Sequence, residues 1–554
     1  MPLNFRAMFL ATIFAAAVLP LAGSFLLFSP DERHYGEAAV QMVQGGELLT
    51  PRAADGALRL HKPILTYWTA AAGFELFGVT ALGLRVGFVL AGGLVVFLTW
   101  RFARQVADDD AAAQTAALIM LSNVWLILTA IRATPDILLC LFMLISAMGA
   151  IELAVICSRS WWAPWALYLG AGFAVATKGL LPLVFVSYAV VFALVQPCSQ
   201  RTGGSGLWHA PSIVAGLVVA GAWYGLMIVL HSHAALGAFW HDQVGGRVGG
   251  GWVHVAAQAG SLALALPISF FPWSLPLVGM GMVDRPAFIA ADAVQRRFGR
   301  FFLGWVVLLV VVFALGSETR SRYLLPAAPL AAVWLANVYR RARPELLDRM
   351  LRGVLVLLLL VLAAFGGLLA WADWQMNAGG RAVVVATCTL AVVGVVPVAR
   401  LLGRRPKPAI AIGLMILALA PIGHLGAGPI FLPASGSQIA RALALHVPDA
   451  TNRTVVYVGA PAMATQIRLC AAGRYEVQHR KDLDDPIDPQ AVVVGPTIKL
   501  DSLDVGAYRI HMAARRLGET EPLELIRAIV RNRLLQYAAE QSEVHLIAVP
   551  RDGQ

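Results

Sequence analysis

Long apolar runs separated by short polar stretches occupy most of this chain. A run of about 17–25 mostly apolar residues is long enough to cross a bilayer as a helix. We count thirteen such runs, near residues 7–29, 81–103, 112–130, 136–156, 164–180, 181–197, 211–231, 261–283, 301–316, 322–340, 350–372, 381–402 and 408–430. The fifth and sixth are divided at Lys178-Gly179 and Pro182, and the first is interpreted as a retained anchor. The pattern predicts an α-helical polytopic membrane domain over residues 1–431.

The pattern changes from residue 432 onward. Short apolar segments at 454–459, 491–495 and 544–549 predict buried strands, and amphipathic stretches at 437–446, 462–472 and 522–539 predict helices between them. A small α/β domain outside the membrane is therefore predicted over residues 432–554.

Composition agrees with a membrane protein and explains the net charge. Of the 554 residues, 58% are hydrophobic and 14% charged, whereas soluble domains carry roughly a quarter charged residues. The net charge of +11 is located on one side of the predicted spans. Every second loop, counted from the N-terminal segment that holds Arg6, lies on that side, and together these loops hold 18 basic and 7 acidic residues. Lys and Arg favour cytoplasmic loops, so the N-terminus is predicted to be cytoplasmic. An odd number of spans then places the α/β domain outside. The charge reports orientation, and no nucleic-acid partner is expected.

Polar residues gather in the first predicted outer loop, residues 31–80. It begins Asp31-Glu32-Arg33-His34-Tyr35-Gly36-Glu37 and later reads His61-Lys62-Pro63-Ile64-Leu65-Thr66-Tyr67-Trp68. Stretches 37–45 and 66–77 have helical spacing and are predicted to lie flat at the interface. Because no helix is expected before about Tyr35, the acidic pair at the membrane edge is interpreted as functional.

Other polar groups lie at outer ends of the predicted spans. They are Arg132 and Asp136, four residues apart, Lys178, the stretch from Asp242 to Arg247, and Arg322-Tyr323. A single cation near a span end is more often a snorkelling anchor than a ligand, and the Arg132/Asp136 pair is as typical of a structural ion pair as of a site. Together, however, cations and a tyrosine suit a phosphate, and a carboxylate suits a hydroxyl acceptor or an oxocarbenium-like centre. The set predicts group transfer from a lipid-linked phosphate.

These blocks resemble a known family. The run at 31–37, Gly45-Gly46-Glu47, Lys62-Pro63-Ile64-Leu65, Arg132-x-x-x-Asp136, Thr177-Lys178-Gly179, the Asp242 to Arg247 loop, Phe271-Pro272-Trp273 and Tyr323-Leu324-Leu325-Pro326 follow the order seen in bacterial lipid-carrier-dependent glycosyltransferases of the GT-C fold. The subgroup contains the aminoarabinose transferases and the protein O-mannosyltransferases. The resemblance covers residues 1–340, and thirteen spans with an exported α/β domain also look like the aminoarabinose transferases.

The resemblance implies roles for individual residues. Asp31 would be the catalytic carboxylate and Asp136 a second acidic residue of the same cavity. Lys62, Arg247 and Tyr323 would hold the phosphate of the polyprenyl donor. The residues implied to orient the substrate are Glu32, Arg33, Tyr35, Arg132, Lys178, Asp242 and Arg322.

A required cofactor is not predicted, with a divalent metal ion left as an open alternative. The histidines supply no His-x-x-x-His pair. The residue before Lys62 is His61, where this family usually has Glu.

The leading hypothesis is a bacterial inner-membrane glycosyltransferase. It would move a monosaccharide, 4-amino-4-deoxy-L-arabinose or a hexose, from undecaprenyl phosphate to a periplasmic acceptor. The acceptor could be lipid A, another glycan or a protein hydroxyl, the last making it similar to a protein O-mannosyltransferase. A lipid flippase or transporter is the alternative of another class. It would need ionisable residues at mid-membrane and inverted repeats, and the apolar runs show neither.

Overall fold

The computed structural model describes most of the chain. The described residues are 3–24, 31–53, 56–60, 62–196, 206–240, 251–283, 292–316, 320–376, 408–431, 436–448, 453–471, 474–484, 486–501, 503, 506–517, 524, 527–528, 531, 533, 536–537 and 542–551.

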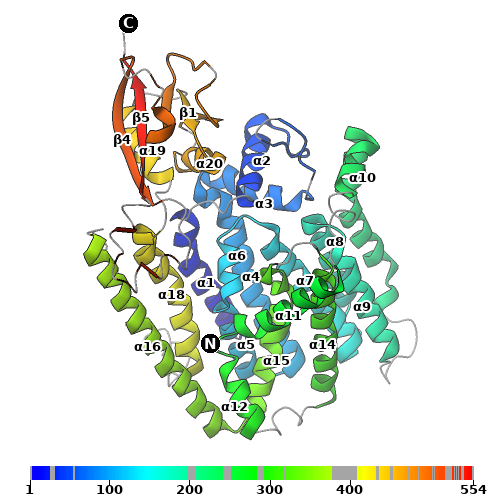
Figure 1. Cartoon of the computed structure of the whole chain (residues 1–554). Coiled ribbons are helices and arrows are strands. Elements are labelled where there is room, and N and C mark those ends of the chain that lie inside the picture. Colours follow the sequence, from blue (N-terminus) through cyan, green and yellow to red (C-terminus); the bar gives the residue numbers. More distant parts are fainter. Residues whose placement is uncertain are drawn as a thin grey trace.

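The helices form a bundle with a smaller mixed domain at one end (Figure 1). Those of the bundle are α1 (Leu3–Ser24), α2 (Asp31–Gly45), α3 (Leu65–Phe77), α4 (Ala81–Ala107), α5 (Asp110–Leu121), α6 (Val124–Ala130), α7 (Pro135–Ile151), α8 (Trp162–Lys178), α9 (Leu181–Val195), α10 (Ala210–Trp240), α11 (Trp252–Ser269), α12 (Leu275–Val283), α14 (Ala293–Ala314), α15 (Ala328–Arg341), α16 (Pro344–Met376) and α18 (Pro408–Phe431). Short π- or 3₁₀-helical segments are η1 (Glu152–Ile156), η2 (Gly206–Trp208) and η4 (Ser321–Ala327).

Every predicted span within the described residues overlaps at least one helix, although residues 112–130 are divided between α5 and α6. By length and apolar composition, seven of the described helices could cross a membrane, or eight if the bent pair α5 and α6 forms one span. The protein is therefore a multi-pass membrane protein, while the count of thirteen stays a prediction. The predicted span at 381–402 lies outside the described residues.

The predicted span at 261–283 has the wrong boundaries. Residues 261–283 do not form a single helix, because α11 ends at Ser269 and α12 begins at Leu275. The intervening turn contains Pro272, which cannot donate a helical hydrogen bond. The helix that could span there is α11 itself, and it begins at Trp252, earlier than predicted.

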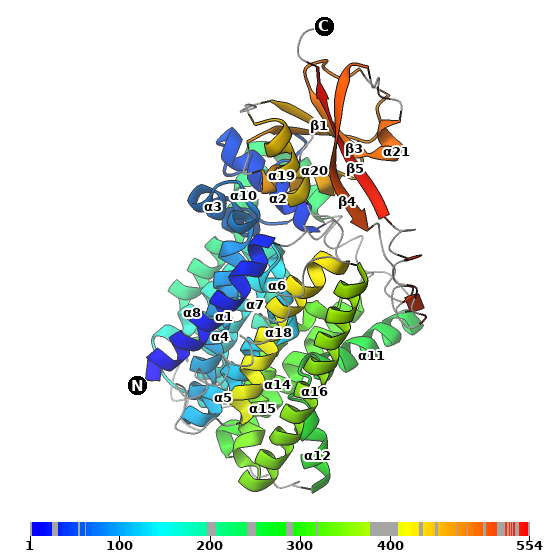
Figure 2. The ribbon, with the colours of Figure 1, turned by 90° about the vertical axis from the view of Figure 1, so that its left-hand side faces the viewer.

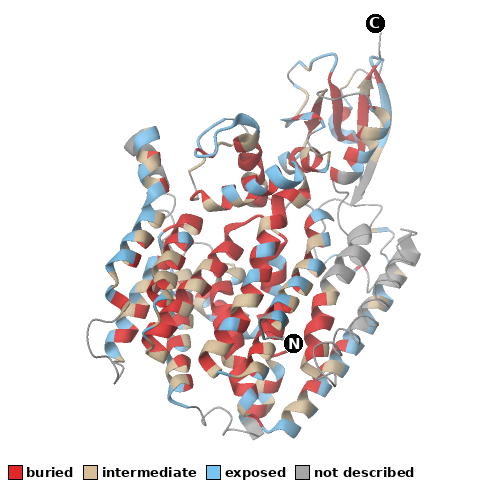
Figure 3. Ribbon diagram, turned by 180° about the vertical axis from the view of Figure 1, so that it is seen from behind, coloured by how far each residue is buried: buried red, intermediate tan, exposed pale blue. Residues whose placement is uncertain are grey.

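Helix α4 lies at the centre of the bundle and packs against α1, α3, α5 and α7. Its start is fixed by Thr80, whose hydroxyl oxygen accepts a hydrogen bond from the Gly83 N–H at 2.9 Å. Buried residues concentrate in α4 and α7, whereas α10 and α16 keep exposed apolar side chains such as Val229 and Leu360 (Figure 3). Outward apolar faces are expected where lipid surrounds the bundle.

Side-chain contacts tie together the loops predicted to be cytoplasmic. Arg340 Nη1 lies 3.8 Å from Asp109 Oδ2. Arg341 donates to the Gln295 side chain, and Arg300 Nη1 donates to Gln196 Oε1 at 2.9 Å. The loops share one end of the bundle, as their alternation along the chain predicts.

The C-terminal domain is built on a five-stranded sheet. The strands are β1 (Thr454–Val458), β2 (Glu476–Arg480), β3 (Val492–Pro496), β4 (Tyr508–Leu517) and β5 (Ser542–Pro550), in the order β2-β1-β3-β5-β4. Strands β1, β2 and β3 are parallel, and β5 pairs antiparallel with both β3 and β4. The helices described in this domain are α19 (Gly436–His446), α20 (Pro461–Cys470) and α21 (Thr497–Leu500).

Alternation along β1 builds two apolar layers on this sheet. Val455 and Tyr457 join the core that contains residues of α19 and α20, and Val456 and Val458 join the core on the other face. This confirms the α/β character predicted for the region, including β1, β3, β5, α19 and α20. The predicted helix at 522–539 lies mostly outside the described residues.

The sheet domain lies at the same end of the bundle as α2 and α3 (Figures 1 and 2). Helix α20 contacts both α2 and α4. The first outer loop and the C-terminal domain therefore share one face of the membrane domain.

Candidate active site

Helix α2 begins at Asp31, about four residues earlier than predicted. The acidic pair therefore lies in the first helical turn, where carboxylates are favoured by the helix dipole. The argument that no helix exists there for the pair to cap is wrong. The two carboxylates nevertheless face different surroundings. The side chain of Asp31 is 42% exposed and that of Glu32 is fully buried.

Asp31 is linked to Asp136 through a single arginine. Arg322 Nη2 donates to Asp31 Oδ2 at 2.9 Å, and Arg322 Nε lies 3.0 Å from Asp136 Oδ2. Arg320 Nη1 adds a contact to Asp31 at 3.2 Å. The two arginines come from η4 and the residue before it, so η4 brings together carboxylates from α2 and from the first turn of α7.

Lys178 closes the other side of Asp136. Its Nζ lies 2.5 Å from Asp136 Oδ1 and 4.1 Å from the centre of the Tyr323 ring. Tyr323 in turn packs on Phe313, with ring centres 5.0 Å apart. Lys62 is near enough to interact electrostatically with Asp136. Four cations, Lys62, Lys178, Arg320 and Arg322, thus surround two aspartates.

Glu32 has a different environment from Asp31. Its two carboxylate oxygens accept hydrogen bonds from Arg85 Nε at 2.7 Å and Arg85 Nη2 at 2.8 Å. The Ala133 N–H adds a third at 2.8 Å, and Arg85 Nη1 donates to the Ala22 carbonyl at 2.9 Å. This buried cluster joins the ends of α1 and α6 to the starts of α2 and α4. The predicted role of Glu32 in orienting a substrate stays a prediction.

Arg132 and Asp136 do not share a helical face. Arg132 lies in the turn before α7, and Asp136 lies in the first turn of that helix. Burial and the nearby charge of Arg322 lower the pKa of Arg132, while Glu32 and Asp136 oppose that shift. Arg132 therefore lies close to the cluster, near enough to Glu32 and Asp136 to interact electrostatically with both carboxylates.

Two tyrosines form the wall next to the carboxylates. The rings of Tyr35 and Tyr67 are 5.3 Å apart, and both residues are buried. Burial raises the pKa of Tyr35 well above its usual range and that of Tyr67 to about 12. Both hydroxyls therefore stay neutral near pH 7 and can donate a hydrogen bond. Arg33 points elsewhere, toward Glu37, with Nη1 3.1 Å from Glu37 Oε1.

Two predicted site residues, Asp242 and Arg247, lie outside the described residues. Within the part of the chain that is described, no three His, Cys, Asp or Glu side chains gather as metal ligands would.

Known proteins with a similar sequence or fold support the resemblance. Residues 61–234 match the family model described as dolichyl-phosphate-mannose-protein mannosyltransferase. An uncharacterized protein of Aquifex aeolicus is 26% identical over 56% of this chain and 59% of its own length. An undecaprenyl phosphate-alpha-4-amino-4-deoxy-L-arabinose arabinosyl transferase of Pseudomonas fluorescens is 28% identical over 65% of this chain and 64% of its own. The chain thus spans less than two thirds of either relative.

The solved structures decide the fold. The crystal structure of ArnT from Cupriavidus metallidurans bound to undecaprenyl phosphate superimposes with a TM-score of 0.67, at 19% identity, over 97% of both chains. This chain has the GT-C fold of ArnT. The apo structure of the same protein superimposes with a TM-score of 0.65. In this GT-C fold, the cluster around Asp31 and Asp136 lies where the starts of α2 and α7, the end of α8 and η4 meet.

Sequence reasoning missed three residues of this region. Arg85, Arg320 and Tyr67 were not predicted as site residues, although Tyr67 lies in a stretch predicted to lie flat at the interface. Arg85 begins an otherwise apolar run, and a charge there marks a partner at membrane depth. That signal could have singled out Arg85, but not its pairing with Glu32, 53 residues earlier.

Proposed function

We propose that this chain is a membrane glycosyltransferase that moves one sugar from a polyprenyl phosphate to an acceptor outside the cytoplasm. The observation that carries the proposal is the Asp31–Arg322–Asp136–Lys178 chain of contacts, in which Asp31 alone is substantially exposed. The GT-C fold of ArnT and the aminoarabinose transferase relatives support it.

The cations suit the leaving group of such a reaction. In transfer, the bond between the sugar anomeric carbon and the phosphate oxygen breaks, and polyprenyl phosphate leaves with the electron pair. Charge-assisted hydrogen bonds from Lys62, Lys178 and Arg322 would stabilise that phosphate. Arg322 Nε lies 3.0 Å from Asp136 Oδ2 but is not aligned for a hydrogen bond among the described residues, so the guanidinium keeps a donor for a phosphate oxygen. Arg247 and Tyr323 remain proposed members of this set.

Asp31 suits the reacting centre. Its carboxylate is exposed enough to meet a substrate, while Arg320 and Arg322 fix its position. An acceptor hydroxyl would bond to the anomeric carbon and pass its proton to Asp31. If the acceptor is an ionised phosphate, Asp31 would act by stabilising positive charge on the sugar. Buried Asp136 would hold Lys178 and Arg322 in place.

We also propose the orientation and the domain boundary. The N-terminus lies in the cytoplasm, the first outer loop and the α/β domain lie in the periplasm, and the domains meet at residues 431 and 432. Undecaprenyl phosphate is the proposed donor, the sugar being 4-amino-4-deoxy-L-arabinose or a hexose. Lipid A is the first acceptor to test. A protein hydroxyl is the second, and the match of residues 61–234 to a protein mannosyltransferase model supports it.

The Asp31→Asn variant tests the catalytic assignment. Membranes carrying it should transfer labelled sugar from undecaprenyl phosphate at least roughly 10²-fold more slowly than wild type, the usual scale for a lost acid–base group. Asp108→Asn is the matched control, because Asp108 is exposed and pairs with Arg104 in a loop predicted to lie on the opposite side. Near-normal transfer by Asp31→Asn would sink the assignment.

The acceptor is tested separately. Mass spectrometry of lipid A, surface polysaccharide and exported protein from a deletion strain should show one of them lacking a sugar mass. Unchanged masses in all three, together with altered transbilayer movement of the lipid carrier, would favour a flippase.

A further inference from the structure

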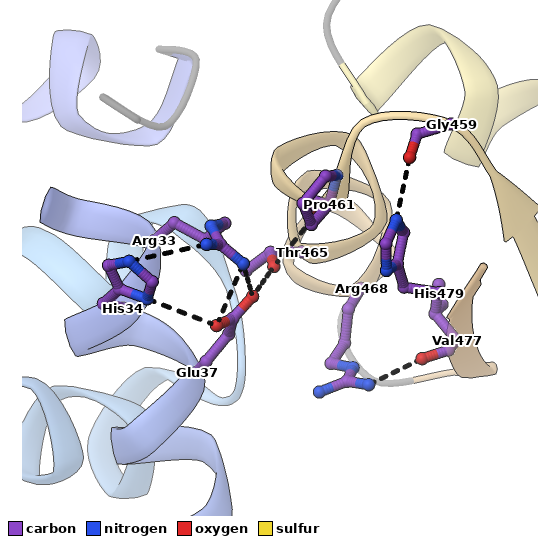
Figure 4. Close-up of polar contacts among 9 residues, drawn as sticks. All are labelled: Arg33, His34, Glu37, Gly459, Pro461, Thr465, Arg468, Val477 and His479. Carbon is purple, nitrogen blue, oxygen red and sulfur yellow. Dashed lines mark hydrogen bonds and ion pairs between the residues drawn. The ribbon is translucent and has the colours of Figure 1, made fainter. Parts of the chain in front are cut away.

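Among the described residues, a hydrogen bond joins α2, the helix that begins at Asp31, to the C-terminal domain. The Thr465 hydroxyl of α20 donates to Glu37 Oε1 of α2 at 2.6 Å, across 428 positions of sequence (Figure 4). Thr465 and Glu37 are 4% and 7% exposed. Leaving a buried carboxylate without a hydrogen-bond partner costs folding free energy, so loss of this contact is expected to destabilise the protein.

Glu37 receives its hydrogen bonds from both domains. On α2, Arg33 Nη1 lies 3.1 Å from Glu37 Oε1 and 3.4 Å from Oε2. His34 Nδ1 lies 4.0 Å from Oε2, but burial and the charges of Arg59 and Arg33 lower the pKa of His34. Near neutral pH, Arg33 is therefore the charged partner on α2. From α20, Thr465 supplies the hydroxyl, and Arg468 lies near enough to Glu37 to interact with it electrostatically.

Helix α20 is anchored on both sides of this contact. Leu469 is buried in the apolar core of the membrane domain, and the Cys470 thiol lies near enough to Arg85 to interact with it electrostatically. On the other side, the Gln466 side-chain oxygen accepts from the Gly436 N–H at 3.1 Å, which ties α20 to α19. Arg468 Nη2 donates to the Val477 carbonyl of β2 at 2.6 Å (Figure 4). One helix thus links the sheet to the membrane domain.

Helix α2 connects the Thr465–Glu37 contact to the proposed transfer site, because Glu37 and Asp31 lie in the same helix. Asp31 and Glu37 are six residues apart in one helix, which is about 9 Å along its axis. Glu32 fixes the first turn through Arg85, and Tyr35 packs on Tyr67 of α3. Thr465 adds a contact further along. Contacts at both places restrict the tilt and rotation of α2, and they thereby restrict the position of the Asp31 carboxylate.

We propose that the C-terminal α/β domain forms part of the transfer site, because Thr465 and Glu37 hold α2 and thereby position Asp31. Glu37 and Thr465 are positioning residues, since neither reaches the reacting atoms. The effect on transfer rests on the proposed glycosyltransferase function, whereas the holding of α2 does not.

Hydrogen–deuterium exchange of the full-length protein in detergent tests the holding of α2 without any substrate. Thr465→Val keeps the side-chain shape and removes the hydroxyl, so amides of residues 31–45 should exchange several-fold faster. Thr465→Ser restores the hydroxyl and should return exchange to the wild-type rate. Thr497→Val is the matched control, because the Thr497 hydroxyl bonds the Val544 carbonyl in the same domain, away from α2. Wild-type exchange in Thr465→Val would overturn the proposal.

Kinetics test the consequence for transfer. Thr465→Val should lower kcat roughly tenfold, with KM for the undecaprenyl donor changed less than about twofold, because a displaced catalytic group affects the transition state more than binding. Thr465→Ser should recover most of kcat, and Thr497→Val should match wild type. Faster exchange of α2 with unchanged kcat would overturn the positioning role. An inactive wild-type protein would defeat the proposed function, while the exchange result would still decide whether the domain holds α2.

A double variant tests whether the two residues act through their shared bond. Glu37→Ala should lower kcat at least as much as Thr465→Val, because it also releases Arg33. Adding Thr465→Val to Glu37→Ala should cause little further loss. Fully additive losses would show that the residues act independently and would contradict the proposal.

Discussion

Neighbouring residues of one type can carry opposite roles when their surroundings differ. Asp31 is partly exposed and held by arginines that can also meet a phosphate. Glu32 is buried, and three N–H groups occupy its oxygens. Removing one partner of a buried ion pair destabilises the protein, because the other charge is left without compensation. We therefore assign Glu32 and Arg85 to the stability of the site.

The Arg85→Met variant tests this assignment. It leaves the buried Glu32 carboxylate unpaired, and we expect unfolding to become easier by about 3–5 kcal/mol. Thermal unfolding in detergent measures the loss. The double variant Arg85→Met with Glu32→Leu removes both charges and should recover much of the stability. If Arg85→Met alone unfolds at the wild-type temperature, the pair is not structural.

At the scale of helices, the contact between α3 and α4 depends on the absence of side chains. A methyl group added to Gly73 would collide with the Gly83 carbonyl oxygen, and one added to Gly83 would collide with the Gly78 carbonyl oxygen. Small residues let helices approach closely in membranes. This approach positions α3, whose Tyr67 packs on Tyr35 of α2.

Gly73→Ala should therefore push α3 away from α4. We expect a loss of about 1–3 kcal/mol in stability, typical of overpacking, and a lower rate of sugar transfer because Tyr67 moves with α3. Gly225→Ala is the control, since the added methyl group on α10 meets no atom within 4 Å. Alanine there should be neutral or slightly stabilising. Equal unfolding temperatures for the two variants would contradict the close-packing argument.

At the scale of the whole molecule, the hydrophobic pattern predicted the positions of helices more reliably than it predicted the contacts between side chains. Apolar runs located every described span and three of the strands, because burial on all sides leaves a continuous apolar signal. Strand β2, with sequence EVQHR, was missed because most of its side chains face solvent. Likewise, alternation of loops placed Asp31, Asp136, Lys178 and Arg322 on one side. Their pairing depends on η4, whose position no local pattern encodes.

The orientation of the chain in the membrane is a property of the intact molecule. Contacts gather the basic loops at one end, whereas the Thr465–Glu37 bond keeps the C-terminal domain beside α2. The positive-inside rule assigns the basic end to the cytoplasm, so both Asp31 and residue 554 should lie in the periplasm. Alkaline phosphatase fused after Gln554 should be active, because it folds only where its disulfides form. Green fluorescent protein fused at the same residue should stay dark when exported through the same membrane route. The reverse pattern would place the transfer site on the cytoplasmic face and exclude a periplasmic acceptor.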